Sequence, residues 1–316
     1  MTYELPNPTH PLNIGTRGSP LALAQAYETR ERLARAFDLP FEAFNIVVIS
    51  TTGDRIIDRP LKEIGGKGLF TREIEQAMLD GSIDIAVHSM KDMPVAQPEG
   101  LLLDTYLPRE DVRDAFISMN TKTLADLPVG AVVGTSSLRR QAQLKLKRPD
   151  LNVVEFRGNL QTRLKKMGDK VAEATFLAMA GLNRLKMDEV ARTAIEVEDM
   201  LPAIAQGAIG IERRVDDMRS ADMLAAIHDG PTGQRLAAER AFLAALDGSC
   251  ETPIGGLSIL DGGSMRLRGE VLRPDGSDAI TDDVTALIED GPAAGREMAT
   301  KMLEKAGDGF FDWRKG

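Results

Sequence analysis

The sequence predicts an α/β protein with more than one domain, and three observations support this. At 316 residues, the chain exceeds what one hydrophobic core usually organises. Through the first two thirds, short apolar stretches alternate with amphipathic helical patterns, which is typical of strand–helix units. After about residue 230 the pattern changes to a long helix, alternating strands and a last helix, which indicates a smaller α+β domain.

The first strand–helix unit starts with a helix over residues 19–37, since Ser19 suits an N-cap and Pro20 suits the first helical position. Residues 107–111, with Pro108, break the periodicity, and we expect the chain to cross there into a second unit. The other elements expected before this point are a strand at 46–50, a helix near 70–80 and a strand at 83–90.

The second unit and the C-terminal segment follow the same reasoning. The second unit is expected to contain strands at 131–134, 152–156 and 174–180 and helices at 138–148 and 159–167. The C-terminal segment is expected to contain a helix at 233–246, strands within 257–272 and a helix near 293–305.

Composition narrows the class of protein. A single cysteine cannot form an intramolecular disulfide, and His10, His88 and His228 offer no zinc-type spacing, so we expect no metal. The N-terminus lacks the parts of a secretory signal and no stretch approaches the length of a membrane span, which predicts a cytoplasmic protein that does not bind membranes. A formal charge of −9 argues against the whole chain binding nucleic acid.

A local basic stretch contrasts with this acidic chain: residues 135–170 hold ten Lys or Arg against three acids. For the lysines, a solvated helix face explains the charge equally well.

Arginines also stand at three strand-to-helix turns, where backbone N–H groups and guanidinium groups together favour carboxylates. Such turns lie where open α/β sheets place their ligands, so we infer a small, carboxylate-rich ligand. Pairing of each arginine with a surface acid is the structural alternative. The turns contain Arg17 with Ser19, Arg139 and Arg140 after Thr135 and Ser137, and Arg157 with Arg163.

The strand at 83–90 leads into Ser89, Lys91 and Asp92 before Pro94. A carboxylate at the mouth of a strand could stabilise a cation formed during reaction or pass a proton to a leaving amine. An ordinary turn aspartate before a proline is the alternative.

Two glycine-rich segments contain candidate functional residues, Lys67 and Cys250. Residues 65–68 lack the Ser or Thr and the spacing of a phosphate loop, which excludes a nucleoside triphosphatase, but Lys67 could lie on a mobile cover. Cys250 lies in a turn-rich segment, 248–256, which favours a usable thiol modestly over a small buried side chain.

Taken together, these segments resemble the porphobilinogen deaminase family across nearly the full length of the chain. The resemblance is carried by IGTRGSPLALAQ (14–25), GGKGLFTREIE (65–75), DIAVHSMKDMP (84–94), VGTSSLRRQAQL (133–144), FRGNLQTRL (156–164), LAMAGLNRL (177–185), LPAIAQGAIGIE (201–212) and GSCETPIGG (248–256).

The resemblance implies a transferase, hydroxymethylbilane synthase, which condenses four porphobilinogens with loss of ammonia in tetrapyrrole (haem and chlorophyll) biosynthesis. It also implies a dipyrromethane cofactor joined to Cys250 by a thioether, catalysis by Asp92, and a monomer. The implied fold is two α/β lobes like those of periplasmic binding proteins plus a small α+β domain. The implied boundaries are domain 1 at 1–107 and 206–228, domain 2 at 108–205, and domain 3 at 229–316.

The resemblance assigns further residues to binding. For the cofactor these are Ser89, Lys91, Asp92, Thr135, Ser137, Arg139, Arg140, Arg157, Arg163 and Arg184. For the substrate they are Arg17, Ser19, Lys67, Phe70, Arg157, Arg163 and Arg184.

The sequence departs from the family pattern in three places. Glu63, beside Lys62, stands where the family often has lysine, so a substrate role is not assigned to Lys62. Ala205 stands where glycine commonly occurs, and residues 173–175 replace a commoner Asp-Ala pattern.

Two other functions remain open at this point. A non-catalytic small-anion binding protein would have the same lobes and arginine turns, although no export signal is present. Nucleic-acid binding through residues 135–170 is the other, and there Phe156 is the one aromatic available for base stacking.

Overall fold

The computed structural model describes residues 3–55, 68–246, 248, 252–307 and 309–315. The chain forms two compact units: unit 1 comprises Met1–Glu110 and Ala208–Gly233, and unit 2 comprises Asp111–Gly207 and Gln234–Gly316. The three-domain boundaries expected from the sequence remain a prediction.

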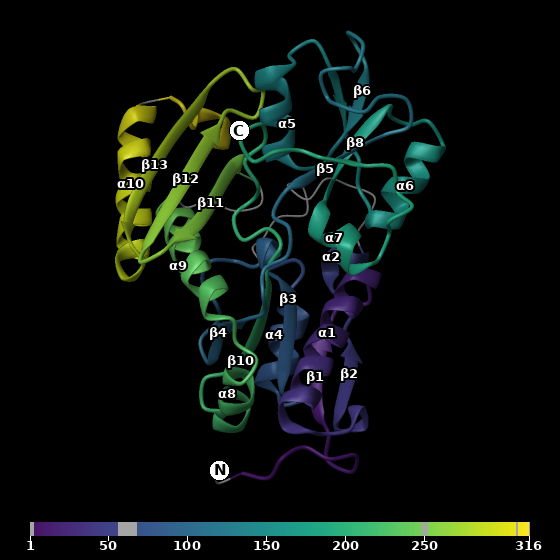
Figure 1. The fold of residues 1–316 in the computed structure, drawn as a ribbon, viewed down its shortest axis with the longest axis vertical. Helices are drawn as coiled ribbons and strands as arrows, with labels where there is room; N and C mark the ends of the chain where they lie inside the picture. The colour runs from purple at the N-terminus through teal and green to yellow at the C-terminus, as the bar shows by residue number, and fades with distance from the viewer. Residues whose placement is uncertain (1–2, 56–67, 247, 249–251, 308, 316) are drawn as a thin grey trace. The chain divides into compact units, whose positions relative to one another are not determined.

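Unit 1 is built on a five-stranded sheet in the order β2-β1-β3-β10-β4 (Figure 1). The three strands β2, β1 and β3 are parallel, whereas β10 runs antiparallel to both of its neighbours, β3 and β4. The strands are β1 (Leu12–Thr16), β2 (Phe44–Val48), β3 (Ile85–Ser89), β4 (Leu101–Tyr106) and β10 (Ile209–Arg214).

Helices cover both faces of this sheet. On one face, Leu33 of α1 (Pro20–Phe37) and Met223 of α8 (Met218–Ala225) pack into the main core of the unit. On the other face, Ile74 of α4 (Arg72–Leu79) packs with Ala86. Short helical turns complete the unit: η1 (Phe41–Ala43), α2 (Thr52–Arg55) and η2 (Met90–Asp92).

Unit 2 contains a second five-stranded sheet, in the order β7-β6-β8-β5-β9. Here again three parallel strands, β7, β6 and β8, meet one antiparallel strand, β5. Leu144 of α5 packs on one face of the sheet, and Leu182 of α7 packs on the other. The elements are β5 (Asp114–Ser118), β6 (Val132–Gly134), α5 (Leu138–Lys147), β7 (Asn152–Val154), α6 (Leu160–Gly168), β8 (Ala174–Ala178), α7 (Met179–Arg184) and β9 (Thr193–Ala194).

The C-terminal part of unit 2 is an antiparallel three-stranded sheet, β11-β12-β13. Phe242 of α9 and Met298 of α10 lie so close to Gly269 of β12 that a Cβ there would be 2.5 Å from the Phe242 ring. The small C-terminal α+β part expected from the sequence is therefore confirmed. Its elements are α9 (Gly230–Ala245, which begins in unit 1), β11 (Ile254–Asp261), β12 (Ser264–Leu272), β13 (Ala279–Leu287), η3 (Ile288–Asp290), α10 (Gly291–Ala306) and η4 (Asp312–Lys315).

The α/β class is confirmed, and local signals located the helices α1, α4, α5, α6, α9 and α10 but not α2, α7 or α8. The side chain of Ser19 caps α1 by accepting a hydrogen bond from the N–H of Ala22 at 3.3 Å, and Pro20 is the first helical residue. The expected strand at 174–180 was too long, because the chain turns into α7 at Met179. The pattern did not reveal β1, β4, β5, β9, β10 or β13.

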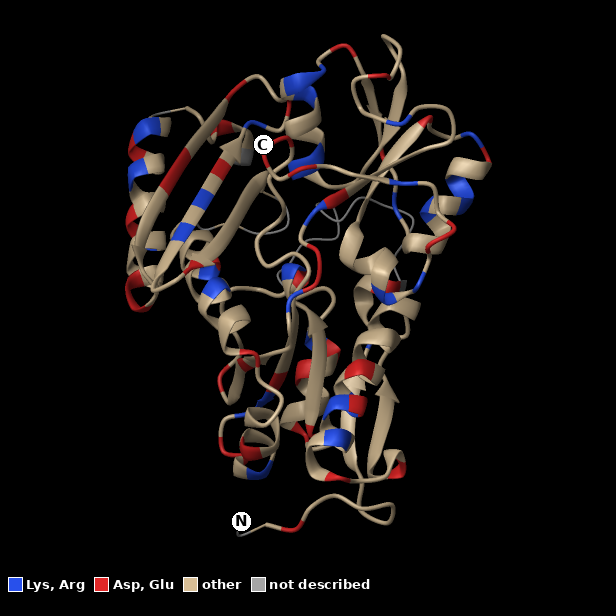
Figure 2. Ribbon diagram, in the orientation of Figure 1, with Lys and Arg blue, Asp and Glu red and all other residues tan. Residues whose placement is uncertain are grey.

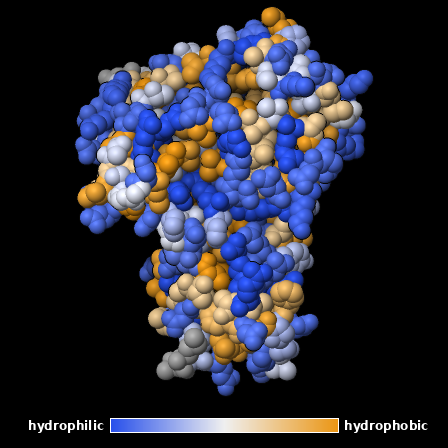
Figure 3. Space-filling model, viewed as in Figure 1, coloured by the Kyte–Doolittle hydropathy of each residue, from blue (hydrophilic) through white to orange (hydrophobic). Residues whose placement is uncertain are grey.

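On the face that Figure 3 shows, apolar residues form separate spots among mostly hydrophilic ones. Exposed large apolar side chains of the described residues include Val48, Met119 and Val129. Among the described helices, none has the length and apolar content required to cross a bilayer.

Candidate active site

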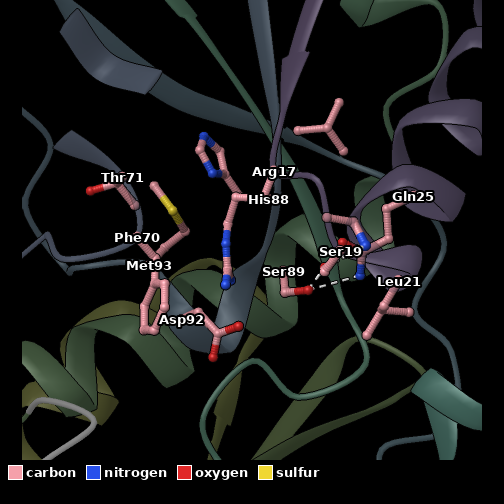
Figure 4. Close-up of a pocket in the computed structure, with 12 residues that line it drawn as sticks. Arg17, Ser19, Leu21, Gln25, Phe70, Thr71, His88, Ser89, Asp92 and Met93 are labelled. Atoms are coloured by element: carbon pink, nitrogen blue, oxygen red, sulfur yellow. Dashed lines mark hydrogen bonds between the residues drawn. The ribbon is translucent and has the colours of Figure 1, made fainter. Parts of the chain in front are cut away.

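A pocket in unit 1 lies where β1 and β3 end and α1 begins. Its lining includes three residues from the strand-to-helix turns and the β3 mouth: Arg17, Ser19 and Asp92 (Figure 4). The sequence placed these residues at the carboxyl ends of strands, where ligands bind in open α/β sheets. The remaining lining residues are Leu21, Ala22, Gln25, Phe70, Thr71, Val87, His88, Ser89 and Met93.

Asp92 closes a short 3-10 turn directly after β3. The turn is anchored by Met90, which is buried. The Met90 N–H donates to the carbonyl of Ala208 at 3.0 Å, and the Met90 side chain fills the space beside Gly210. Asp92 itself is exposed. The backbone thus holds this carboxylate at a fixed place while leaving it open to a ligand or solvent.

Arg17 points into the same pocket, and it has partners there. Its Nε donates to both carboxylate oxygens of Asp54 at 3.2 Å, and its Nη2 forms an ion pair with the same group. Its guanidinium carbon lies 4.2 Å from the centre of the Phe70 ring, within the range of a cation–π contact. Phe70, which the family resemblance assigns to substrate binding, therefore contacts the arginine that is also predicted to bind substrate.

The hydroxyls of the pocket also have defined roles. Ser19 caps α1, and Ser89 exchanges hydrogen bonds of 2.8 and 3.0 Å with the amide of Gln25 (Figure 4). Behind them, His88 Nε2 lies 3.1 Å from a carboxylate oxygen of Glu212, and both residues are buried. Burial, with a smaller contribution from the negative Glu212, raises the pKa of Glu75 nearby.

In unit 2, Arg139 and Arg140 are buried and both bind Asp114, which is fully buried. Arg139 Nη2 lies 2.8 Å from one oxygen of Asp114, and Arg140 Nη2 lies 2.6 Å from the other. Burial alone would raise the pKa of Asp114, but the two guanidinium groups hold it well below its usual range. The two arginines therefore share one counter-charge, and their predicted contact with the cofactor remains a prediction.

The hydroxyls beside these arginines shape the turn before α5. Ser137 is the N-cap and accepts from the N–H of Arg140 at 3.4 Å, and Thr135 Oγ1 accepts from the N–H of Ser137 at 3.1 Å. The expected capped turn is present, with both hydroxyls used inside it.

The third arginine turn has a different character. Asn159 caps α6, and Gly158 before it has a φ of +122°, a value that disfavours any residue with a Cβ. Arg163 Nε donates to the Gly158 carbonyl at 2.9 Å, and Arg184 Nη2 donates to the Gly207 carbonyl at 2.9 Å. Arg157 Nη1 is buried and has no hydrogen-bond partner among the described residues. A buried guanidinium donor without a partner fits an anionic ligand.

Cations of the basic stretch appear along α5 and α6 in Figure 2, and many of them bind within unit 2. Lys145 donates to the carbonyl of Pro149 at 3.2 Å, Arg148 pairs with Asp150 at 2.6 Å, and Lys165 pairs with Asp169 at 2.7 Å. These contacts use charge that a nucleic-acid surface would present to phosphates.

Several sequence predictions fall outside the described residues, among them those on Cys250, Lys67, Lys62 and Glu63. Ala205 is described: it adopts a φ of +60°, in the left-handed region that glycine prefers. The departure from the family's glycine is therefore accommodated with backbone strain, and the Ala205 N–H donates to Glu239 Oε2 at 2.8 Å.

Sequence reasoning missed Asp54, Gln25 and Asp114. Asp54 follows Gly53 just beyond a strand, a position that reads equally well as an ordinary turn. Asp114 was detectable as an acid directly before the apolar stretch 115–117. A buried carboxylate needs a positively charged partner, and the neighbouring sequence does not show which residue supplies it.

An α/β chain with an open carboxylate and an arginine in one pocket, and with further arginines at the helix starts of a second sheet, belongs to the class of proteins that handle small carboxylated molecules. The comparisons with known proteins narrow this class.

The chain belongs to the porphobilinogen deaminase family. The family model described as "Porphobilinogen deaminase, dipyromethane cofactor binding domain" matches residues 12–222, and that of the C-terminal domain matches residues 234–304. A porphobilinogen deaminase of Paracoccus denitrificans (strain Pd 1222) is 64% identical over 310 residues, which cover 98% of this chain and 99% of the relative. The chain is accordingly a transferase with a dipyrromethane cofactor-binding domain.

Solved structures of periplasmic proteins are also similar. A Salmonella typhimurium periplasmic binding protein with high arginine specificity is 14% identical, with a TM-score of 0.40, over 68% of this chain and 91% of that one. The periplasmic VFT2 domain of BvgS from Bordetella pertussis is 13% identical, with a TM-score of 0.41, over 73% of this chain and 92% of that one.

Proposed function

We propose that this chain is a hydroxymethylbilane synthase, which joins four porphobilinogen molecules with loss of ammonia into a linear tetrapyrrole. The observation that carries the proposal is the exposed carboxylate of Asp92 in one pocket with Arg17, within a chain that belongs to the porphobilinogen deaminase family. The alternative of a non-catalytic anion-binding protein is not favoured, since it does not explain the family match.

The chemistry of the donors fits the cofactor. A dipyrromethane made from porphobilinogen carries acetate and propionate groups, for which guanidinium groups are matched partners. The buried Nη1 of Arg157, without a partner among the described residues, supports a role in binding such a carboxylate. When bound, the cofactor supplies the free pyrrole α-carbon on which the chain of pyrroles grows.

The residues of the pocket have distinct tasks in this proposal. The Asp92 carboxylate accepts hydrogen bonds from pyrrole N–H groups and offsets the positive charge that develops on the ring as the amine departs. Arg17 binds a substrate carboxylate, and Phe70 supports its guanidinium group by stacking. Together they orient the substrate carbon toward the bond that forms.

An ammonia assay tests the function. Purified protein incubated with porphobilinogen should release ammonia and form hydroxymethylbilane. An anion-binding protein would bind porphobilinogen reversibly and release no ammonia, and that result would contradict the proposal.

We further propose that the cofactor is attached at Cys250. Because Cys250 is the single cysteine of the chain, the intact mass of the purified protein should exceed the sequence mass by that of two linked pyrroles. The Cys250→Ala variant should show the unmodified mass and no turnover. A wild-type protein that makes bilane with an unmodified thiol would refute the attachment.

Arg157→Gln is expected to reduce the fraction of chains that acquire the cofactor, without loss of stability. A charge-assisted hydrogen bond contributes about 1.5–3 kcal/mol, so affinity for the cofactor before its thioether forms should fall by about tenfold or more. The melting temperature should stay close to that of the wild type, because the change removes a buried donor without a described partner. The fraction of chains with the cofactor mass measures the effect.

Arg192→Gln is the matched control for this variant, because Arg192 is also in unit 2 but binds Asp188 and the Met187 carbonyl. If both variants retained the cofactor equally, Arg157 would have no part in binding it.

We also propose that the enzyme acts in the cytoplasm as a monomer that binds no nucleic acid. Sedimentation at several protein concentrations tests the monomer, and titration with DNA and RNA at low salt tests the last point.

A further inference from the structure

Asp54, on the short helix α2, is the residue that fixes Arg17. Both carboxylate oxygens accept from Arg17 Nε at 3.2 Å, and Oδ1 also accepts from Nη2. The two side chains are about three-quarters buried, with exposed fractions of 25% and 27%. The contact is therefore a partly desolvated, side-on pairing of a guanidinium with a carboxylate, the geometry that orients an arginine most strongly.

Asp54 is itself held in place. Its Oδ2 accepts from the Thr51 hydroxyl at 2.7 Å and from the Thr51 N–H at 3.3 Å. Partial burial would raise the pKa of Asp54, but the hydrogen bonds from Arg17 and Thr51 outweigh it and lower the pKa. The carboxylate thus stays charged at neutral pH and has little freedom to turn away.

The second support for Arg17 comes from the same few residues. The N–H of Gly53 donates to the Leu69 carbonyl at 2.9 Å, and a Cβ on Gly53 would lie 2.2 Å from the Phe70 ring. This close packing joins α2 to the turn that holds Phe70 against the guanidinium of Arg17. This short segment therefore contacts Arg17 directly through Asp54 and supports it indirectly through the packing of Gly53 against Phe70.

This arrangement leaves one part of the guanidinium available. The Nε and Nη2 edge binds Asp54 and the guanidinium carbon lies over the Phe70 ring, whereas Nη1 has no hydrogen-bond partner among the described residues. Figure 4 shows the Arg17 side chain extended into the pocket that Asp92 also lines. An arginine whose conformation is already fixed loses less freedom when a ligand binds.

We propose that Asp54 is a positioning residue for the reaction: it holds Arg17 so that Nη1 is presented to a carboxylate of the incoming porphobilinogen. The proposal rests on the proposed function. The alternative is that Asp54 is an internal competitor, which occupies Arg17 and has to be displaced by the substrate. The two roles predict opposite changes in KM when Asp54 is replaced. Loss of a positioning residue raises KM, whereas loss of a competitor lowers it.

The test uses the cofactor-loaded enzyme and the Asp54→Asn variant. We expect kcat/KM for porphobilinogen to fall about tenfold, mostly through KM, because the neutral amide orients Arg17 less firmly. In an Arg17→Met background the same Asp54→Asn change should alter kcat/KM by less than about twofold, since the residue through which it acts is gone.

The matched control is Asp104→Asn. Asp104 pairs with Arg213 at 2.8 Å in the same unit and does not line the pocket with Asp92, so kcat/KM should stay at the wild-type value. Should Asp54→Asn fail to fold, Thr51→Val removes the hydroxyl that holds Asp54 and should give a smaller rise in KM.

Three results would overturn the proposal: an unchanged KM in both the Asp54 and Thr51 variants, a lower KM in Asp54→Asn, or an equal fall in kcat/KM with and without Arg17. These results presuppose an active wild type. If the wild type released no ammonia, the proposed function would fail instead, and the two failures are thereby distinguished.

Discussion

Replacing Asp92 by alanine is expected to lower kcat by on the order of a thousandfold while leaving the protein folded. The large effect follows from the position of this carboxylate, which is exposed in the pocket directly after β3. The fold should tolerate the change, because the turn is anchored by the backbone of Met90 and not by the Asp92 side chain. Ammonia release under single-turnover conditions, with a melting curve, measures both effects.

The matched control for Asp92 is Glu99→Ala, an exposed acid of unit 1 that does not line the pocket. It should turn over at the wild-type rate. A normal kcat in the Asp92→Ala enzyme would show that Asp92 takes no part in the reaction. The pocket would then contribute substrate binding by Arg17 alone.

Asp114→Asn is expected to destabilise the protein by about 3–5 kcal/mol, because it removes the carboxylate that two buried guanidinium groups bind. Asp114 accepts from Arg139, from Arg140 and, at 3.0 Å, from Gln206, so one uncharged side chain cannot replace it. Urea denaturation at neutral pH measures the change in the free energy of unfolding.

The control for Asp114 is Asp199→Asn, which breaks the exposed ion pair with Lys147 in the same unit and should cost less than about 1 kcal/mol. Equal losses in the free energy of unfolding in the two variants would show that the buried pairing stabilises the protein no more than an exposed ion pair does.

The same contacts predict how the wild type responds to acid. Because the folded state lowers the pKa of Asp114, its stabilisation is complete above the ordinary aspartate pKa of about 4 and is lost as pH falls below that value. The Asp114→Asn variant should lack this part of the acid sensitivity, so its urea midpoint should depend less on pH between about pH 4 and pH 2.

How much could be predicted depends on how local the signal is. Ser19 and Pro20 mark the start of α1 by their own chemistry, and the structure has both where expected. By contrast, β10 is buried along nearly its whole length and is recognisable only once β3 and β4 lie beside it. Strand pairing between residues more than a hundred positions apart has no counterpart in a sequence window.

The site shows the same limit. The arginine turns and the Asp92 motif were visible in the sequence, and the family resemblance gave them roles. The partners of Arg17 and Arg140 were not visible, because Asp54 and Asp114 lie 37 and 26 residues away. The chemistry that a residue type can perform is predictable from the local sequence. The side chains that bind and orient that residue are known only from the folded chain.

The place of β10 has a consequence for synthesis on the ribosome. The strand between β3 and β4 is supplied by residues 209–214, so the first 110 residues emerge without the middle of their own sheet. Residues 114–178, which hold four of the five strands of the other sheet, are complete before then. The second sheet can therefore assemble first on the nascent chain, and a fragment ending before residue 209 should expose unpaired strand edges and aggregate.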